Sequence, residues 1–316
     1  MLTNRSVSAG DSAGSARPLV AGNSAGAPGS LEAGTDAAAG PRSEAVLITG
    51  CSSGIGRAAA LALARAGLPV WASARRVESL EGLRAAGCRT LRLDVTDEQS
   101  RQAAVRAVEA EHGAVGVLIN NAGYGQAGPV EEITPEMLHR QFDTNVFGLV
   151  RMCQLVLPGM RAQHSGTIVN VGSAAGLMSA PGSAAYSMTK WSVEALSDAL
   201  RFETRGFGVR VVLLEPGGVT STRFMETETA SWPATGGPYD TFRNNRRVRL
   251  ERWNRDGAPG MSTPDDVARV VVRAVTAGNP RARYKIGVAP RLLPLLYRVL
   301  PSRQWDAFWR RLMPMN

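Results

Sequence analysis

The chain has 316 residues, 44% of them hydrophobic and 20% charged, so it can bury a large core and is not a wholly disordered chain. No stretch reaches the roughly 18 uncharged apolar residues that a membrane-spanning helix needs, which excludes a polytopic membrane protein. The formal net charge of +9 comes from two late segments, 243–255 and 281–316, but no zinc-finger spacing or RNP motif accompanies it, so a dedicated nucleic-acid binder is not expected.

Residues 1–43 are dominated by Ala, Gly and Ser and show hardly any aliphatic periodicity. This composition predicts a disordered tail, and its apolar run Pro18 to Ala21 is too short for the core of a secretory signal. The three cysteines, Cys51, Cys88 and Cys153, are too few and too scattered for a disulfide framework or a zinc site. We therefore predict no metal site and a reducing, cytoplasmic location.

From Ala45 onward, short apolar runs alternate with segments of helical periodicity. The predicted strands are Ala45 to Thr49, Pro69 to Ala74, Arg89 to Leu93, Val115 to Ile119, Thr167 to Val171, Val209 to Glu215 and Arg283 to Val288. The predicted helices are Ile55 to Ala66, Asp97 to His112, Thr134 to Arg161, Ser183 to Arg205 and Thr263 to Thr276. This alternation is typical of βαβ units. It predicts one α/β domain over 44–289, a Rossmann-type doubly wound parallel sheet of about seven strands with helices on both faces.

Two segments depart from the alternation. Residues 220–262 contain no clear strand and are long for a loop, which predicts a substrate loop or lid. In the basic extension 290–316, apolar side chains recur at helical spacing and predict a short amphipathic helix: Trp305, Phe308, Trp309, Leu312 and Met313. This helix either packs on its own domain or a partner subunit, which we favour, or contacts a membrane peripherally with its aromatic face in the headgroup region.

A glycine-rich loop joins the first strand directly to the first helix, with the sequence Thr49-Gly-Cys-Ser-Ser-Gly-Ile-Gly56. Glycines at this junction permit a tight turn and close approach of the backbone to a pyrophosphate, which the N–H groups of the helix N-terminus would bind. A simple turn is the alternative. The glycine spacing is weak by itself and gains weight only from the motifs that follow.

The second strand ends at Ala74-Arg75-Arg76, where an NAD enzyme would place a carboxylate on the ribose 2′-hydroxyl. A carboxylate there would repel a 2′-phosphate, whereas a guanidinium binds it with charge-assisted hydrogen bonds. We therefore predict NADP(H) in preference to NAD(H), with Arg75 as the main phosphate contact. The alternative is that the two arginines only cap a surface strand.

Tyr186 and Lys190 stand four residues apart on a predicted helix and therefore on one face of it. The pKa of a free tyrosine, about 10, is too high for efficient proton transfer at neutral pH, and a neighbouring ammonium stabilises the phenolate. Such a pair is common by chance on surface helices, so its meaning depends on the other motifs.

The glycine loop, Asn120-Asn121-Ala122-Gly123, Ser173 and Tyr186-x3-Lys190 together resemble the classical short-chain dehydrogenase/reductase family, in the family's order and over about Glu44 to Val288. The resemblance implies that Tyr186 is the general acid or base and that Ser173 hydrogen-bonds the substrate oxygen. It implies that Lys190 tunes Tyr186 and holds the nicotinamide ribose, and that Asn145 holds a proton-relay water.

The resemblance also implies a cofactor site, with Asp94 and Val95 at the adenine and the Asn121 segment at its ribose. The implied cofactor-binding residues are Gly50, Ser52, Ser53, Gly54, Ile55, Gly56, Arg75, Asp94, Val95, Asn121, Ala122, Gly123, Tyr186, Lys190, Pro216, Gly217, Val219 and Ser221. Ser221 stands where the family usually has Thr beside the nicotinamide, and Thr222 follows it, so which hydroxyl serves the carboxamide stays open.

The leading hypothesis is an NADP(H)-dependent oxidoreductase that interconverts a carbonyl and an alcohol by hydride transfer. A weaker resemblance, in the two loop serines, the Ala-Arg-Arg strand end and the C-terminal extension, favours a lipophilic substrate that is steroid-, retinoid- or lipid-like. The alternative is a catalytically silent NADP-binding regulator or scaffold, against which the complete tetrad argues. Family members commonly assemble through the helices at 134–161 and 183–205, so we also expect a homo-oligomer.

Overall fold

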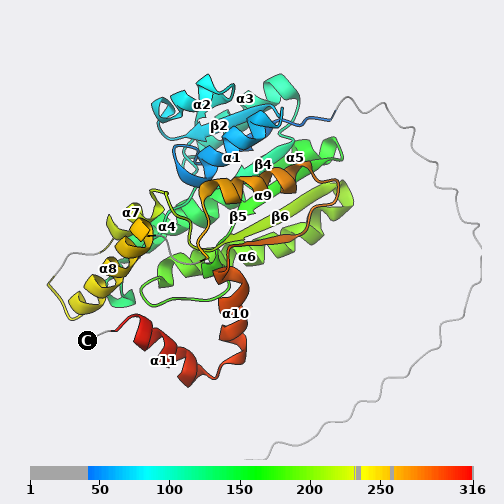
Figure 1. Ribbon diagram of the computed structural model, residues 1–316. Coiled ribbons are helices and arrows are strands. Elements are labelled where there is room, and N and C mark those ends of the chain that lie inside the picture. Colours follow the sequence, from blue (N-terminus) through cyan, green and yellow to red (C-terminus); the bar gives the residue numbers. More distant parts are fainter. Residues whose placement is uncertain (1–41, 231, 233–235, 257–259, 315–316) are drawn as a thin grey trace, which may run out of the picture. The chain divides into compact units, whose positions relative to one another are not determined.

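The computed structural model describes residues 42–230, 232, 236–256 and 260–314 (Figure 1). The predicted tail, 1–43, lies outside the described residues except for Arg42 and Ser43. Ser43 belongs to the folded domain, because its hydroxyl donates a 2.6 Å hydrogen bond to the carbonyl of Ala114 and its N–H donates to Oε1 of Gln163 at 3.0 Å.

Seven parallel strands form a single sheet in the order β3-β2-β1-β4-β5-β6-β7. Their bounds are β1 Val46–Ile48, β2 Val70–Ala74, β3 Arg89–Arg92, β4 Val117–Asn120, β5 Gly166–Val171, β6 Val209–Pro216 and β7 Arg283–Ile286. All seven lie within a residue or two of the predicted strands. The chain order reverses between β1 and β4, which confirms the doubly wound Rossmann-type sheet.

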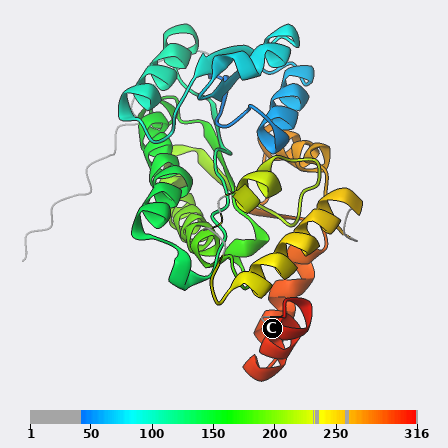
Figure 2. The same ribbon diagram turned by 90° about the vertical axis from the view of Figure 1, so that its left-hand side faces the viewer.

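Helices cover both faces of the sheet (Figures 1 and 2). The long helices are α1 Gly54–Arg65, α3 Glu98–His112, α5 Gly148–Ala162, α6 Ala184–Thr204 and α9 Pro264–Thr276; shorter ones are α2 Glu81–Ala85 and α4 Pro135–Phe142. Successive strand residues point to opposite faces. Val46 and Ile48 therefore join the core under α1 and α9, whereas Leu47 joins the core under α3, α5 and α6.

The segment 220–262 differs from the prediction of a loop, because it contains α7 (Phe224–Ala230) and α8 (Asp240–Asp256). The buried positions of α8 include Phe242, Arg243, Arg246 and Leu250, which do follow a helical spacing. Two of them are arginines, so the apolar periodicity that predicts a helix is missing. The first basic segment is thus partly internal, since Arg243 pairs with Glu132 and Arg246 also forms a buried ion pair.

The C-terminal extension forms two helices, α10 (Ala289–Val299) and α11 (Ser302–Leu312), the second of which confirms the predicted amphipathic helix. Trp305 and Trp309 are buried in a cluster with Met178 and Phe242 of the main domain. The aromatic face of α11 therefore packs on its own chain, as the favoured interpretation predicts. Within the described part of the chain, no helix is both long enough and apolar enough to cross a membrane.

Candidate active site

The predicted site residues converge at the carboxyl ends of the central strands. The glycine loop follows β1, Asn121 follows β4, Ser173 lies two residues beyond β5, and Gly217 follows β6. In an open parallel sheet, ligands bind outside the carboxyl ends of the strands where the strand order reverses. The reversal between β1 and β4 is at this end, so the fold brings together residues far apart in sequence.

The glycine loop is held against the end of β4. Asn121 donates from Nδ2 to the carbonyls of Thr49 (2.9 Å) and Gly50 (3.0 Å). Gly50 and Gly54 have φ angles of +75° and +56°, which favour glycine. A Cβ atom on Gly56 would lie 2.4 Å from Asn121 Nδ2, so only glycine permits this packing.

The N-terminus of α1 fits an anionic ligand. Its N-cap, Ser53, makes no side-chain capping hydrogen bond, and its first turn carries no acidic residue. Free N–H groups and the helix dipole favour a phosphate at such a position. Ser52 is exposed and Ile55 is half-buried against the core. Cys51, by contrast, is fully buried, and this burial raises the pKa of its thiol to about 12.

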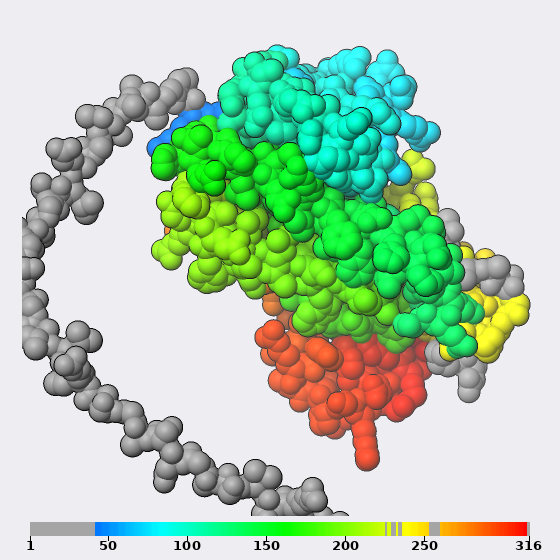
Figure 3. All heavy atoms as spheres, turned by 180° about the vertical axis from the view of Figure 1, so that it is seen from behind, coloured from blue at the N-terminus to red at the C-terminus, as the bar shows by residue number. Residues whose placement is uncertain are grey.

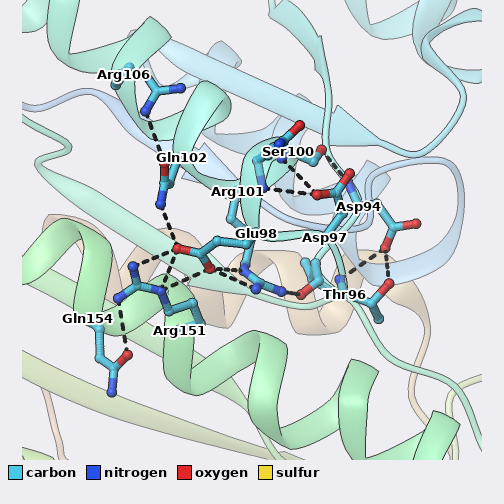
Figure 4. A network of polar contacts seen from close by, with 12 residues as sticks. Asp94, Thr96, Asp97, Glu98, Ser100, Arg101, Gln102, Arg106, Arg151 and Gln154 are labelled. Carbon is cyan, nitrogen blue, oxygen red and sulfur yellow. Dashed lines mark hydrogen bonds and ion pairs between the residues drawn. The ribbon is translucent and has the colours of Figure 1, made fainter.

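The expected adenine end of the site lies beside β2 and β3. Arg75 and Arg76 are exposed directly after β2. Asp94 follows β3, and its carboxylate accepts hydrogen bonds from the N–H (3.0 Å) and hydroxyl (2.8 Å) of Thr96 (Figure 4). Partial burial opposes ionisation, but these hydrogen bonds and the nearby Arg75 hold the pKa of Asp94 below its ordinary value. The side chain of Val95 is buried, so only its backbone can face a ligand.

Figure 4 also shows how this corner is braced. Glu98 on α3 pairs with Arg101 one turn along and with Arg151 of α5 (2.6 Å). Hydrogen bonds from these arginines lower the pKa of the Glu98 carboxyl. The network therefore links the helix that follows Asp94 to the helix that packs beside it.

Tyr186 and Lys190 lie on α6, and Ser173 lies opposite them after β5. The Ser173 side chain is close enough to the Tyr186 hydroxyl to lower its pKa. Lys190 is buried, donates from Nζ to the carbonyl of Val171 (2.7 Å) and lies 5.7 Å from the centroid of the Tyr186 ring. Burial raises the pKa of Tyr186, although Ser173 acts the other way, and burial lowers the pKa of Lys190 to about 8.

Asn145 lies in a π-helical turn, Asp143–Phe147, between α4 and α5. Its Oδ1 accepts from the N–H of Tyr124 (3.1 Å), and its Nδ2 donates to the Tyr124 carbonyl (2.9 Å) and to Thr189 Oγ1 (3.1 Å). Thr189 immediately precedes Lys190 on α6. Asn145 therefore fixes the chain after β4 to the helix that carries Tyr186.

The segment after β6 forms the remaining wall. Gly217 donates from its N–H to the carbonyl of Ile286 (3.0 Å), and Val219 forms a parallel bridge with Ser262. Ser221 is exposed with a φ of +57°. Thr222 instead lies close to Gly54: a Cβ atom added to that glycine would be 3.3 Å from the methyl group of Thr222. Of the two candidate hydroxyl residues, the structure thus places Thr222 against the glycine loop.

Sequence reasoning missed the residues of α7 and α8 that close the site. The ring of Phe224 lies 5.2 Å from that of Tyr186, centroid to centroid. Glu228, one turn later, is buried and paired with Arg246, which also donates to Ser183 Oγ (2.9 Å). The Glu228 charge adds to the rise in the pKa of Tyr186. Nothing in the sequence indicates this pairing, because its partners are 18 residues apart in a segment without an apolar pattern.

A second group of charged side chains lies next to Lys190, between α6 and the strands β6 and β7. Glu194, one turn after Lys190, and Glu215 at the end of β6 are both buried, and both pair with Arg283 of β7. Asp198 binds the other end of the same guanidinium at 2.6 Å. Burial raises the pKa of Glu194 to about 7, although Arg283 opposes the rise. Arg283, part of the second basic segment, is therefore half-buried, and its charge is paired with these carboxylates. The described residues contain no group of three or more potential metal ligands.

Comparison with known proteins identifies the family. The model for short chain dehydrogenases matches residues 44–232. An uncharacterized oxidoreductase of Escherichia coli K12, YbbO, is 33% identical over 264 residues, which cover 83% of this chain and 93% of that protein. The 3-ketodihydrosphingosine reductase of Bacteroides thetaiotaomicron is 35% identical over 251 residues, covering 78% of this chain and 89% of the reductase.

Solved structures agree with these relatives. A short-chain dehydrogenase from Streptomyces avermitilis superposes with a TM-score of 0.70 at 32% identity, covering 86% of this chain and 97% of its own. A serine dehydrogenase complexed with NADP+ gives 0.68 at 28% identity (77% and 94% covered). A 3-ketoacyl-(acyl-carrier-protein) reductase from Brucella melitensis complexed with NADH gives 0.65 at 25% identity (77% and 96% covered).

The serine dehydrogenase structure holds NADP+ and the 3-ketoacyl reductase structure holds NADH, which supports a nicotinamide cofactor without deciding between the two. The family model covers more than half of the chain, and the relatives match most of its length. The chain is therefore an oxidoreductase that belongs to the short-chain dehydrogenase/reductase family.

Proposed function

We propose that the protein is an NADP(H)-dependent oxidoreductase that interconverts a carbonyl and an alcohol, with Tyr186 as the general acid or base. The observation that carries the proposal is the position of buried Lys190, 5.7 Å from the centroid of the Tyr186 ring, with Ser173 close enough to the Tyr186 hydroxyl to lower its pKa. Two hydroxyls at one point form a site for one substrate oxygen. A silent regulator would have no use for this arrangement. Turnover of a panel of ketones and alcohols with NADPH or NADP+ tests the proposal.

The chain's own residues handle the proton. Tyr186 donates its phenolic proton to the carbonyl oxygen in reduction and accepts it from the alcohol in oxidation, while Ser173 hydrogen-bonds the same oxygen. The ammonium of Lys190 stabilises the phenolate that forms. The side chain of Asn145 is committed to Tyr124 and Thr189, so we place the relay water at the main chain of the π-helical turn. A bound nicotinamide supplies or accepts the hydride.

The preference for NADP(H) rests on Arg75. It is exposed at the end of β2 and close enough to Asp94 to lower the pKa of that carboxyl. A 2′-phosphate at this edge would meet a guanidinium, with no acidic residue at the strand end to repel it. The other cofactor contacts follow the described geometry, with Thr222 in place of Ser221 at the carboxamide.

A lipophilic substrate fits the side of the site that α7 covers. The Phe224 ring packs on Tyr186 and would offer an apolar surface beside the reacting carbon. The similar protein named 3-ketodihydrosphingosine reductase supports a sphingoid or related ketone. The cytoplasmic location remains part of the proposal and is supported by three buried cysteines with free thiols.

Lys190 and the neighbouring carboxylate of Glu194 predict a pH dependence of the reaction rate. Above its pKa of about 8, Lys190 loses its proton and no longer stabilises the phenolate, so we expect kcat/KM for carbonyl reduction to fall as the pH rises through about 8. Glu194→Gln should move this fall to lower pH, because it removes the negative charge that raises the pKa of Lys190. Rate profiles from about pH 6 to 10 measure the shift.

Asp198→Asn is the matched control for this shift. It removes one charge from the same Arg283 cluster, but one helical turn farther from Lys190, and should leave the profile in place. An unshifted profile in Glu194→Gln would show that Glu194 does not act on Lys190.

We also propose a homo-oligomer built on the outer faces of α5 and α6. Large apolar side chains are exposed on α6 and at the end of the π-helical turn that leads into α5, and a monomer would leave them in water: Phe147, Met188, Trp191 and Phe202. Of these side chains, Phe147 also lines an open pocket of about 440 Å³ with Arg101 and Arg151, and none of the catalytic residues lines it. Trp191→Glu should lower the mass measured by light scattering to that of a smaller assembly. An unchanged mass in this variant would place the interface elsewhere.

A further inference from the structure

The helix α10 carries an exposed apolar stripe. The stripe consists of four aliphatic side chains, of which the first belongs to the N-cap residue: Val288 (53% exposed), Leu292 (48%), Leu295 (57%) and Val299 (65%). At 3.6 residues per turn, their spacing of 4, 3 and 4 places all four within about 60° of one another. Leu293 and Leu296, about 130° and 70° from the centre of the stripe, pack into the cluster that holds α11.

Arginines flank this stripe on one side. Arg291 and Arg298 are exposed and seven residues apart, about 60° to 90° from the centre of the stripe. The described part of the extension from 281 onward has seven exposed basic residues against one exposed acid, Asp306: Arg281, Lys285, Arg291, Arg298, Arg303, Arg310 and Arg311. Within that part of the chain, none of the seven is in an ion pair.

This combination differs from the situation of three arginines that pair with carboxylates elsewhere in the fold. Arg243, Arg246 and Arg283 are each neutralised by a carboxylate inside the fold. Around α10, by contrast, the ion pairs of the described residues include no carboxylate that neutralises the exposed basic side chains. Figures 1 and 3 show α10 and α11 as a lobe at one end of the domain.

We propose that this face of α10 docks on an anionic lipid bilayer. The helix would lie in the plane of the interface, with the four aliphatic side chains entering the headgroup boundary and Arg291 and Arg298 meeting lipid phosphates and carboxylates. The contact differs from the one considered from the sequence, because Trp305 and Trp309 are buried and α10, not α11, presents the apolar surface.

A second copy of the chain is a poorer occupant. A two-fold interface on this stripe would bring the same patch together with itself. Arg291 and Arg298 would then approach their own copies, and like charges across an interface are unfavourable. An anionic surface meets both the apolar and the positive parts of the face.

Docking would also orient the proposed active site. The cluster under α11 contains Met178, in the loop after Ser173, and Phe242 of α8. Asn245 of α8 further donates a 3.0 Å hydrogen bond to the Pro314 carbonyl. Figure 2 shows α8 (yellow) beside the C-terminal helices. The lobe that meets the bilayer is therefore packed directly on the elements that close the site.

Flotation of the full chain with vesicles tests the proposal without relying on turnover. Vesicles of phosphatidylcholine with about 30% phosphatidylserine should carry the protein up a density gradient, and pure phosphatidylcholine vesicles should not. Raising the salt from about 0.05 M to 0.5 M should release it, because salt screens the arginines. Leu292→Glu/Leu295→Glu should abolish flotation, and Arg291→Glu/Arg298→Glu should weaken partitioning by more than tenfold, on the order of fivefold for each charge removed.

The matched control for the leucine variant is Val130→Glu, because Val130 is apolar, 70% exposed and far from α10 in the sequence. The control for the arginine variant is Arg106→Glu on α3. Both control variants should float like the unchanged chain. All of these sites are exposed, and thermal unfolding checks that each variant folds. Failure to float on anionic vesicles at low salt would overturn the proposal. So would equal flotation of the α10 variants and the controls, or a loss of self-association in Leu292→Glu/Leu295→Glu, which would assign the stripe to a second copy.

Discussion

Tyr186→Phe should reduce kcat by about 10²- to 10⁴-fold, the usual contribution of a positioned general acid or base. The substitution removes only the phenolic oxygen, so the ring still packs against Phe224. Lys190 also keeps its 2.7 Å hydrogen bond to Val171. Steady-state rates with a responsive ketone, together with fluorescence titration of NADPH, separate the proton transfer from cofactor binding.

The control is Tyr297→Phe, a 44% exposed tyrosine of the C-terminal lobe, which should turn over normally. NADPH should bind Tyr186→Phe within a few-fold of the unchanged protein, because the glycine loop and Arg75 are untouched. Turnover at the normal rate would remove Tyr186 from the mechanism. Loss of both turnover and binding would mean that the substitution damages the site as a whole.

Much of the fold could be predicted because its signals are local. The buried parallel strands are short continuous apolar runs, and α1, α3 and α9 each begin at a recognisable helix start. The capping box of Thr263 and Asp266 at α9 is an example. The site could be predicted for a similar reason, since residues at the carboxyl ends of parallel strands must meet at one edge.

The rest depends on pairings that the sequence does not encode locally. In α8, Arg243 and Arg246 occupy buried positions where an aliphatic side chain would signal a helix. Their burial is tolerable because Arg243 pairs with Glu132 and Asp240 and Arg246 pairs with Glu228. Arg283 is similar. From the sequence it is expected to be an exposed surface residue, and its pairing with Glu215 follows only once β7 is known to lie beside β6. The sequence therefore overestimates the exposed positive charge wherever an arginine is paired with a carboxylate of a distant element.

Arg75→Asp should raise the Kd for NADPH by about 10²-fold and leave NADH unchanged or bound more tightly. A hydrogen bond to a charged group contributes about 1.5 to 3 kcal/mol, and each 1.4 kcal/mol is a factor of ten in affinity. The new carboxylate adds repulsion toward a 2′-phosphate but can accept a hydrogen bond from a 2′-hydroxyl. Arg76→Asp is the matched control, one residue farther along and also exposed, and should have the smaller effect. Fluorescence titration with both cofactors measures the ratio. An equal loss of affinity for both would exclude Arg75 as the phosphate contact, because only the phosphate distinguishes the two ligands.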